Sequence, residues 1–263
     1  MNKASSETVL ITGASSGIGL ELAKCFAADS CRLILVARNQ KALEDLAQEL
    51  RQKNKIEVIV LPADLSLPET PKRIFSELSA QKISVDVLVN NAGFGLHSAF
   101  VESSLQKQLE MLQVNIAALT ELTGLFLPAM IKNGRGGILN VGSVAGFLPG
   151  PNMAVYYATK AFVQSFTEAL AEELSGTNLT ISVLCPGPTE SNFGNVARGG
   201  KSRQIKTAKM LAETVARYGH CAFRAGKIVA IPGLKNRLSV FLIRFIPRRL
   251  VRKMVKTYNT MKD

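Results

Sequence analysis

The chain has 263 residues and a formal net charge of +12; 47% of its residues are hydrophobic, 6% are aromatic and none is tryptophan. This length can bury a large core, and the mildly apolar composition, without repeats or low-complexity segments, excludes fibrous and disordered classes of protein. Alternating strand and helix patterns favour one α/β domain over residues 1–263 rather than two small domains.

The positive charge is concentrated in the last quarter of the chain. Residues 1–197 hold 15 Lys and Arg against 18 Asp and Glu, whereas residues 198–263 hold 17 against 2. Such asymmetry suggests an anionic partner for that end, which is a membrane surface, an acidic carrier or a phosphorylated substrate. We expect no nucleic acid, because there is no recognition motif and no interleaved aromatic pattern that would stack bases.

The lack of a recognisable targeting signal and the cysteine pattern predict a cytoplasmic protein. Residues 1–7 are polar and lead into an apolar run too short for the core of a signal peptide, and no apolar stretch is expected to span a membrane. The cysteines lack Cys-x-x-Cys spacing and accompany only two histidines, so we expect reduced thiols rather than disulfides or a metal site. They are Cys25, Cys31, Cys185 and Cys221.

The first predicted strand leads into a glycine-rich turn. Residues 8–12 form a compact apolar run typical of a buried parallel strand, and a helical pattern follows over residues 20–28. Glycine lets the backbone turn sharply and approach a ligand, and the N–H groups at a helix N-terminus favour a pyrophosphate. The Gly-x-x-x-Gly-x-Gly spacing differs from the Gly-x-Gly-x-x-Gly fingerprint, so a plain strand-to-helix turn is the alternative. The candidate cofactor-binding residues are Gly13, Ser15, Ser16, Gly17, Ile18 and Gly19.

The end of the second predicted strand, residues 32–37, bears on cofactor choice. An acidic residue there would bind the ribose hydroxyls of NAD, but this chain has Ala37 followed by Arg38. Nothing repels a 2′-phosphate, and a guanidinium is available to bind it; a solvated loop arginine is the alternative. An amphipathic helix over residues 39–54 and a strand over residues 56–61 follow. Just past them we expect Asp64 and Leu65 near the adenine, with a helix-capping aspartate as the alternative.

The middle of the chain supplies further polar candidates at strand ends. A helix over residues 71–80 and a strand over residues 85–89 run into an Asn-Asn-Ala-Gly segment, where Asn91, Ala92 and Gly93 would lie against a ribose. A helical pattern over residues 105–127 includes Asn115, which is either a structural bracket or a water holder. A strand over residues 180–184 ends at Pro186, Gly187 and Thr189.

Residues 143–160 contain the candidate reaction centre. A strand over residues 137–141 delivers Ser143, and a helix over residues 153–174 carries Tyr156 and Lys160. Side chains four apart on a helix share a face, so the ammonium is expected to favour the phenolate of the tyrosine, whose free pKa is about 10. A surface helix with a solvated lysine is the alternative for an isolated Tyr-x-x-x-Lys pattern.

These motifs together resemble the short-chain dehydrogenase/reductase family. Residues 12–19 match its glycine turn, residues 90–93 its Asn-Asn-Ala-Gly segment, and Pro186-Gly187 its nicotinamide loop. The resemblance covers roughly residues 7–191 and selects Tyr156 over the adjacent Tyr157. It implies a catalytic tetrad of Asn115, Ser143, Tyr156 and Lys160 and a cofactor site that includes Tyr156, Lys160 and Ser191 besides the residues above.

The resemblance also implies a fold and a reaction. The fold would be a doubly wound, Rossmann-type α/β domain: a parallel sheet of seven strands in the order 3-2-1-4-5-6-7 with helices on both faces, whose last strand is residues 227–231. The protein would be an NADP(H)-dependent carbonyl reductase or alcohol dehydrogenase for a small, apolar substrate, with Tyr156 as proton donor and Asn115 holding a water, and would form a homo-oligomer, a dimer or a tetramer. The alternatives are a 3-oxoacyl-thioester reductase of lipid metabolism and a noncatalytic dinucleotide-sensing interaction protein.

The C-terminal quarter is expected to differ between family members. Residues 192–226 would form a substrate lid, and residues 234–263 a basic, amphipathic extension. Beyond Pro247, apolar residues recur at helical spacing among arginines and lysines. This pattern suits a helix on an anionic membrane, but we favour a lid or subunit-contact helix that packs on its own domain. The apolar residues are Leu250, Val251, Met254, Val255 and Tyr258.

Overall fold

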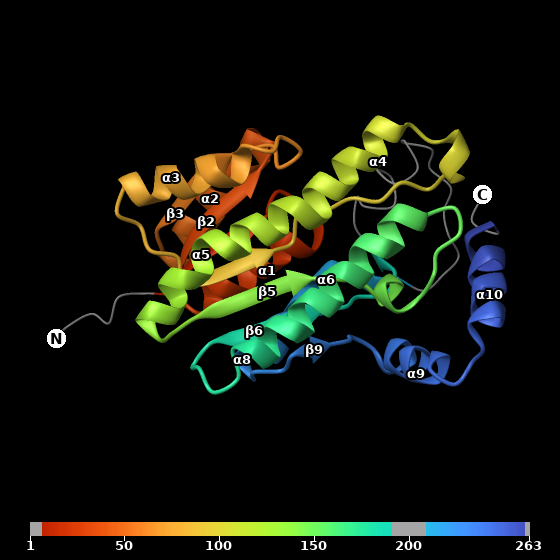
Figure 1. Cartoon of the computed structure of the whole chain (residues 1–263). Helices are drawn as coiled ribbons and strands as arrows, with labels where there is room; N and C mark the ends of the chain where they lie inside the picture. The colour runs from red at the N-terminus through yellow and green to blue at the C-terminus, as the bar shows by residue number, and fades with distance from the viewer. Residues whose placement is uncertain (1–6, 191–208, 261–263) are drawn as a thin grey trace.

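The computed structural model describes residues 7–190 and 209–260. A seven-stranded parallel sheet in the order β3-β2-β1-β4-β5-β6-β9 crosses the molecule, as expected from the sequence (Figure 1). A short parallel pair, β7 with β8, lies outside it. The strands are β1 (Thr8–Thr12), β2 (Arg32–Ala37), β3 (Val58–Pro62), β4 (Val87–Asn90), β5 (Gly137–Val141), β6 (Thr180–Leu184), β7 (Thr189–Glu190), β8 (Met210–Leu211) and β9 (Val229–Ala230).

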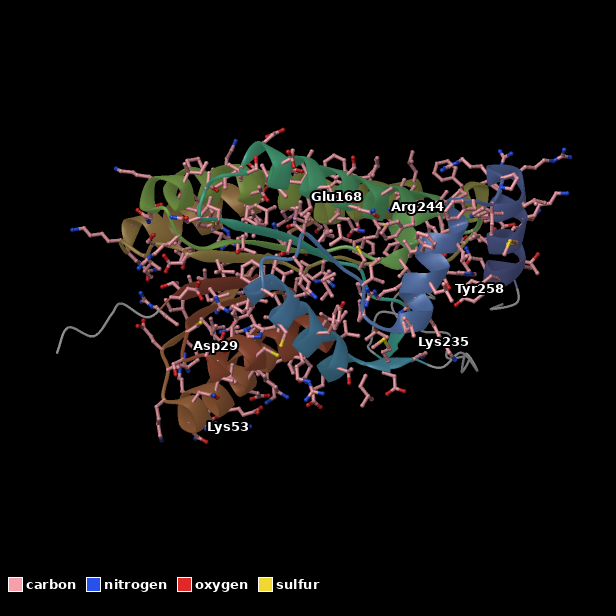
Figure 2. The ribbon with its side chains drawn as sticks, turned by 90° about the horizontal axis from the view of Figure 1, so that it is seen from below. Asp29, Lys53, Glu168, Lys235, Arg244 and Tyr258 are labelled. Carbon is pink, nitrogen blue, oxygen red and sulfur yellow. The ribbon has the colours of Figure 1, made fainter. Side chains whose placement is uncertain are left out.

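Helices cover both faces of the sheet, which gives the doubly wound α/β architecture (Figure 2). Helices α1, α2 and α8 pack on one face, and α3, α5 and α6 on the other. The α-helices are α1 (Gly17–Ala28), α2 (Gln40–Asn54), α3 (Thr70–Ala80), α4 (Leu105–Leu112), α5 (Leu119–Asn133), α6 (Ala154–Glu173), α8 (Ala212–Arg224), α9 (Leu234–Ile243) and α10 (Arg248–Thr260). Shorter helical segments are η1 (Phe100–Glu102), η2 (Gln113–Ala118) and η3 (Val144–Phe147).

The strands are buried on both faces, as apolar runs without polar alternation predict. In β1, Val9 and Ile11 point into the α1/α2/α8 layer, whereas Leu10 points into the opposite layer. All three side chains are fully buried. Because successive side chains of a strand alternate, each strand contributes to both cores and holds the layers together.

The long helix over the sheet differs from its expected form. It runs from Leu105 to Asn133 rather than stopping at residue 127, and its middle turn, η2, is a π-helix. By length and composition alone this helix could cross a membrane, which corrects the expectation that no stretch could do so. In the fold its inner face packs on the sheet through Leu122, Phe126 and Met130.

The described part of the expected lid, residues 209–226, does not form a separate cover. It consists mainly of α8, which packs along α1 through Val215, Ala216 and Phe223 in the core of the domain. Gly226 follows the end of α8 with a left-handed φ of 70°. Residues 192–208 of the expected lid lie outside the described residues.

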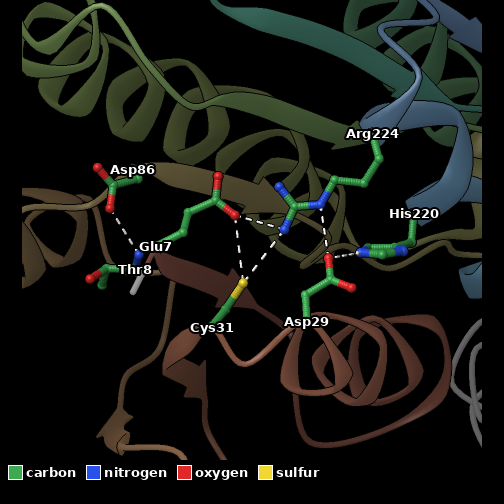
Figure 3. A network of polar contacts seen from close by, with 7 residues as sticks. All are labelled: Glu7, Thr8, Asp29, Cys31, Asp86, His220 and Arg224. Atoms are coloured by element: carbon green, nitrogen blue, oxygen red, sulfur yellow. Dashed lines mark hydrogen bonds and ion pairs between the residues drawn. The ribbon is translucent and has the colours of Figure 1, made fainter. Parts of the chain in front are cut away.

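Charged side chains fasten α8 to the amino-terminal edge of the sheet (Figure 3). Arg224 pairs with Glu7 at 2.6 Å and with Asp29 at 3.0 Å, and His220 lies 2.9 Å from the same Asp29 oxygen. The network joins the start of β1, the end of α1 and the end of α8. It lies at the end of the strands opposite to the candidate site described below.

Candidate active site

The candidate residues lie in the loops that follow the carboxyl ends of the parallel strands, whose arrangement Figure 1 shows. Strands β1, β4, β5 and β6 are hydrogen-bonded neighbours in the sheet, and each is followed by a loop that carries predicted site residues. At this edge neighbouring connections run to opposite faces of the sheet, and the crevice between them is the usual ligand site of open α/β sheets.

The glycine turn and the Asn-Asn-Ala-Gly segment are locked together. The side-chain amide of Asn91 donates to the carbonyl oxygens of Thr12 (2.9 Å) and Gly13 (3.1 Å). In return, the Thr12 hydroxyl accepts from the backbone N–H groups of Asn91 and Ala92, each at 3.0 Å. A Cβ on Gly19 would lie 2.3 Å from Nδ2 of Asn91, so this contact requires glycine. Thr12 belongs to the glycine-turn motif matched from the sequence but is not among the predicted site residues, although a hydroxyl that ends an apolar strand before glycine was a signal.

The N-terminus of α1 has free hydrogen-bond donors. Its N-cap, Ser16, is extended, exposed and makes no side-chain capping bond, and the first turn contains no acidic residue. The first N–H groups of a helix have no intrahelical acceptor, so an anion at this point would gain both hydrogen bonds and the helix dipole.

Arg38 and Asp64 lie at the ends of β2 and β3. Arg38 is exposed, and its side chain has no ion pair or hydrogen bond within residues 7–190 and 209–260. Asp64 instead fixes a turn, because its Oδ1 accepts from Ser66 N at 3.0 Å and its carbonyl accepts from the Thr70 hydroxyl at 2.7 Å. Leu65 is buried beside it. Arg38 is therefore available to an anion. The Asp64 carboxylate holds the turn, and its place near the adenine stays a prediction.

Ser143 and Tyr156 form the centre of the site. Ser143 follows β5, and its hydroxyl accepts from Ala145 N at 3.1 Å and donates to the Pro186 carbonyl at a long 3.4 Å. A hydrogen bond also joins Ser143 to Tyr156. Both side chains are buried, so the two hydroxyl groups lie together and are largely shielded from bulk solvent.

Burial governs the ionisation of Tyr156 and Lys160. It raises the pKa of Tyr156 to about 12, which the hydrogen bond with Ser143 only partly opposes, and it lowers the pKa of Lys160 to about 8. The Lys160 ammonium donates to Val141 O at 2.8 Å and lies 5.9 Å from the Tyr156 ring centroid. The predicted shift of Tyr156 toward the phenolate is thus not seen, because desolvation of the phenolate outweighs its attraction to a cation at that distance.

Asn115 lies in the π turn η2 and acts as a bracket. Its Oδ1 accepts from Phe94 N at 3.1 Å, and its Nδ2 donates to Phe94 O and to the Thr159 hydroxyl, each at 3.0 Å. These bonds hold the loop after β4 against α6 at Thr159, the residue that precedes Lys160. Of the two roles expected for Asn115, the side chain takes the structural one.

The loop after β6 closes the site from the other side. Pro186 O accepts from Val144 N at 3.0 Å, and the Thr189 hydroxyl donates to Gly187 O at 2.9 Å. A Cβ on Gly187 would lie 2.6 Å from Nδ2 of Asn236, so α9 packs directly on this loop. The predicted cofactor contact Ser191 lies outside the described residues.

The two adjacent tyrosines face different partners. Tyr156 is hydrogen-bonded to Ser143, whereas the hydroxyl of Tyr157 donates a hydrogen bond to Oδ1 of Asn259 on α10 at 3.5 Å. Nδ2 of Asn259 also donates to Pro151 O at 2.6 Å. Helix α10 therefore borders the site, and sequence alone gave no signal for Asn259.

These features fit a dinucleotide bound along this edge. Uncapped helix N–H groups suit phosphates, and so does Arg38, which has no ion pair or hydrogen bond within residues 7–190 and 209–260. The glycine turn leaves backbone accessible. Lys160 is a buried cation without a counter-ion in the described structure, which is costly unless a ligand provides acceptors.

Comparisons with known proteins agree with this geometry. The family model described as short chain dehydrogenase matches residues 7–201. The chain is 39% identical over 197 residues to sulfoacetaldehyde reductase 2 of Chromohalobacter salexigens, covering 74% of this chain and 77% of that protein.

Solved structures give the same result. A short-chain dehydrogenase from Sphingobium yanoikuyae in complex with NADPH is similar with a TM-score of 0.82 and 32% identity, covering 92% of this chain and 96% of the other. A short chain dehydrogenase/reductase from Burkholderia phymatum in complex with NAD has a TM-score of 0.79 and 26% identity, covering 92% and 94%. A nicotinamide dinucleotide is thus the cofactor class that these similar structures contain.

Proposed function

Because the chain belongs to the short-chain dehydrogenase family, we propose that it is an NADPH-dependent carbonyl reductase or alcohol dehydrogenase that interconverts a ketone or aldehyde with its alcohol. The observation that carries this proposal is the pair of buried hydroxyls, Ser143 and Tyr156, hydrogen-bonded to each other beside the Lys160 ammonium. Such a pair can hold and protonate one oxygen atom.

During reduction the chain's residues act on the carbonyl oxygen. Ser143 turns its hydroxyl from the weak bond to Pro186 and, together with Tyr156, donates to that oxygen, which polarises the carbonyl carbon. NADPH, when bound, would supply the hydride for this carbon. Tyr156 remains protonated at neutral pH because its pKa is raised, so it transfers its proton to the oxygen as negative charge develops there. Lys160, protonated below about pH 8, stabilises the phenolate that is left.

The cofactor would be held by the edge of the sheet described above. The α1 N-terminus with Gly13 to Gly19 would bind the pyrophosphate, Asn91 to Gly93 and Lys160 the riboses, and Pro186 to Ser191 the nicotinamide end. Asn115 would support Lys160 through Thr159 and hold a water through its backbone. Arg38 would bind the 2′-phosphate, which makes NADPH the preferred cofactor.

Replacing Tyr156 with phenylalanine tests the reaction. We expect Tyr156→Phe to bind cofactor with nearly unchanged affinity but to lose about 10²- to 10⁴-fold in turnover, the usual effect of losing a general acid. Tyr157→Phe is the matched control, because its hydroxyl faces Asn259 and should affect turnover little. Near wild-type turnover of Tyr156→Phe would remove this residue from the mechanism.

Titrating both cofactors tests the preference for NADPH. Loss of a charge-assisted bond from Arg38 costs roughly 1.5 to 3 kcal/mol, so Arg38→Ala should bind NADPH about ten- to a hundredfold more weakly and NADH almost unchanged. Arg73→Ala, an exposed arginine on α3, is the control. Equal affinity of the wild type for the two cofactors would refute the assignment.

A 3-oxoacyl-thioester substrate is a second candidate, favoured by the basic helices α9 and α10 that border the site. NADPH oxidation measured against 3-oxoacyl thioesters, steroids, small ketones and aldehydes separates the two. We further assign a cytoplasmic homo-oligomer, a dimer or a tetramer, supported by the free cysteines and by apolar side chains exposed along α4; light scattering of the purified protein measures the assembly.

A further inference from the structure

The C-terminal helices expose many large hydrophobic side chains. We call the outer side of α9, the turn after it and the outer side of α10 the C-terminal surface; Figure 2 labels Lys235, Arg244 and Tyr258 in this region. Soluble proteins rarely gather apolar side chains in this way without a partner. The exposed residues are Leu234, Leu238, Phe241, Leu242, Phe245, Leu250, Met254 and Tyr258.

Helix α9 carries this apolar character as a stripe. Leu234, Leu238 and Phe241 recur at helical spacing and are 79%, 54% and 55% exposed, while Val240 on the inner side is buried. Phe245 continues the stripe at 72% exposure, and its ring lies 5.4 Å from that of Phe241. Within residues 7–190 and 209–260, the protein core therefore leaves one side of α9 exposed.

Basic residues surround the stripe without compensation. The sequence contains no acidic residue between Glu213 and Asp263, and the basic side chains of α9 and α10 form no ion pair in the described part of the chain. At 100° per residue Lys235 and Arg237 fall on opposite flanks of the α9 stripe. The exposed basic residues are Lys235, Arg237, Arg244, Arg248, Arg249, Arg252, Lys253 and Lys256.

Helix α10 fixes this surface rigidly to the domain. Val251 and Val255 pack in the cluster that contains Tyr156 and Tyr157, and Asn259 is hydrogen-bonded to the loop at Pro151. Only two of the five residues of the apolar stripe expected for this helix are covered in this way. The other three, Leu250, Met254 and Tyr258, face outward.

The charge decides which partner suits the C-terminal surface. A second copy in a two-fold dimer would bring the same uncompensated positive residues against each other, which is unfavourable. An acidic protein would satisfy the charges but would require no stripe of exposed leucine and phenylalanine. An anionic lipid surface satisfies both, because aromatic and aliphatic side chains enter the acyl boundary while arginines and lysines reach the headgroups.

We propose that α9 and the turn after it insert shallowly into an anionic membrane surface, with the basic residues of α9 and α10 bound to lipid phosphates. The surface adjoins the reaction centre, since α9 packs on Gly187 and against η3, the turn that follows Ser143. If the proposed function holds, an apolar carbonyl compound dissolved in the bilayer is the substrate class that this arrangement favours.

Vesicle co-sedimentation of the full chain tests the proposal. We expect binding to phosphatidylglycerol-rich vesicles, none to pure phosphatidylcholine vesicles, and release by high salt. Arg248→Gln, Arg249→Gln and Arg252→Gln combined should weaken binding roughly a hundredfold, at about fivefold per charge. Phe241→Gln with Phe245→Gln should weaken it on the order of tenfold or more.

Control variants match these changes elsewhere on the surface. Lys53→Gln, Arg73→Gln and Lys132→Gln remove three exposed charges, and Leu67→Gln with Ile131→Gln removes two exposed apolar side chains; neither set should alter binding. No sedimentation with anionic vesicles at low salt would overturn the proposal. So would loss of binding in the charge variant but not in the phenylalanine variant, which would indicate a purely ionic, carrier-like partner.

A kinetic measurement separates this inference from the proposed reaction. NADPH oxidation with a long-chain ketone should rise when the ketone is carried in anionic vesicles, and the phenylalanine variant should lose this increase while keeping its activity on a water-soluble aldehyde. Vesicle binding without any reductase activity would refute the proposed function and leave the membrane surface intact. Activity without vesicle binding would do the reverse.

Discussion

Replacing Lys160 with methionine removes a charge that the fold buries without a counter-ion. Lys160 is 6% exposed, its ammonium bonds only to Val141 O within the described structure, and burial lowers its pKa from 10.5 to about 8. Methionine is similar in length and fills the same space without the charge. Lys160→Met should therefore change how stability depends on pH while the packing is kept.

The sign and size of the effect follow from the pKa shift. Below pH 8 the lysine is protonated in both the folded and the unfolded chain, so folding must desolvate an ammonium. Between about pH 8 and 10.5 only the unfolded chain binds the proton, so the free energy of unfolding of the wild type rises with pH. The full shift corresponds to roughly 3 kcal/mol, of which about 2 kcal/mol falls between about pH 7 and 9.5.

Urea unfolding of both proteins over this pH range is the assay. Burial also raises the pKa of Tyr156 and of the cysteines Cys25, Cys31 and Cys185. Lys160 itself lowers the pKa of Cys185, but this thiol, with a pKa of about 12, stays protonated in the folded chain over this pH range, so these contributions nearly cancel in the difference between wild type and variant. The stability of Lys160→Met relative to the wild type should fall by about 2 kcal/mol from about pH 7 to 9.5. Parallel curves would refute the claim that the lysine is desolvated, and the exposed Lys132→Met should give parallel curves.

Three further changes test the packing. Gly19→Ala should lower the free energy of unfolding, measured by denaturant titration, by about 1 to 3 kcal/mol, because the added Cβ would meet Asn91 Nδ2 and Gly13 O. Gly124→Ala is the control: it lies in open space on α5 and should raise the free energy of unfolding by up to about 1 kcal/mol. Asn259→Ala should increase hydrogen exchange across residues 248–260, because Pro151 O loses its donor. The control Thr260→Ala should leave the exchange unchanged. Exchange in Asn259→Ala equal to that of the wild type would mean that Asn259 does not hold α10. Arg224→Met should lower the free energy of unfolding by about 1 to 2 kcal/mol, and by less at high salt, since the ion pairs of Arg224 with Glu7 and Asp29 are partly exposed. The control Arg217→Met, at an exposed arginine, should change it almost not at all. A loss that does not depend on salt would contradict an ionic role.

The residues of the sheet could be predicted because their signal is local. Strands β1, β2, β5 and β6 have the predicted bounds, and each is a short apolar run that ends in glycine, a loop or a polar residue. Tyr156 and Lys160 could be assigned to one helix face for the same reason, since a spacing of four residues fixes their relation before any tertiary contact forms. At the ends of the sheet the prediction was weaker, and the last strand, expected over residues 227–231, is limited to Val229–Ala230.

Other features depended on contacts between distant segments, which no local pattern contains. Asn91 could be read as a cofactor contact, but only the approach of β1 to β4 makes it a bracket for Thr12 and Gly13. The residues of helix α8 are predicted from the sequence to belong to a substrate lid, whereas in the structure they pack against α1 in the core.

The sequence by itself determined the order of the strands' apolar runs, the places of the candidate site residues along the chain and the excess of positive charge at the C-terminus. Tertiary structure decided the ionisation of Tyr156 and Lys160, because the pKa of each depends on the desolvation caused by segments far away in the chain. It also decided which half of the α10 stripe is covered, since periodicity gives an apolar side but not its partner: Val251 and Val255 meet the domain, while Leu250 and Met254 remain exposed.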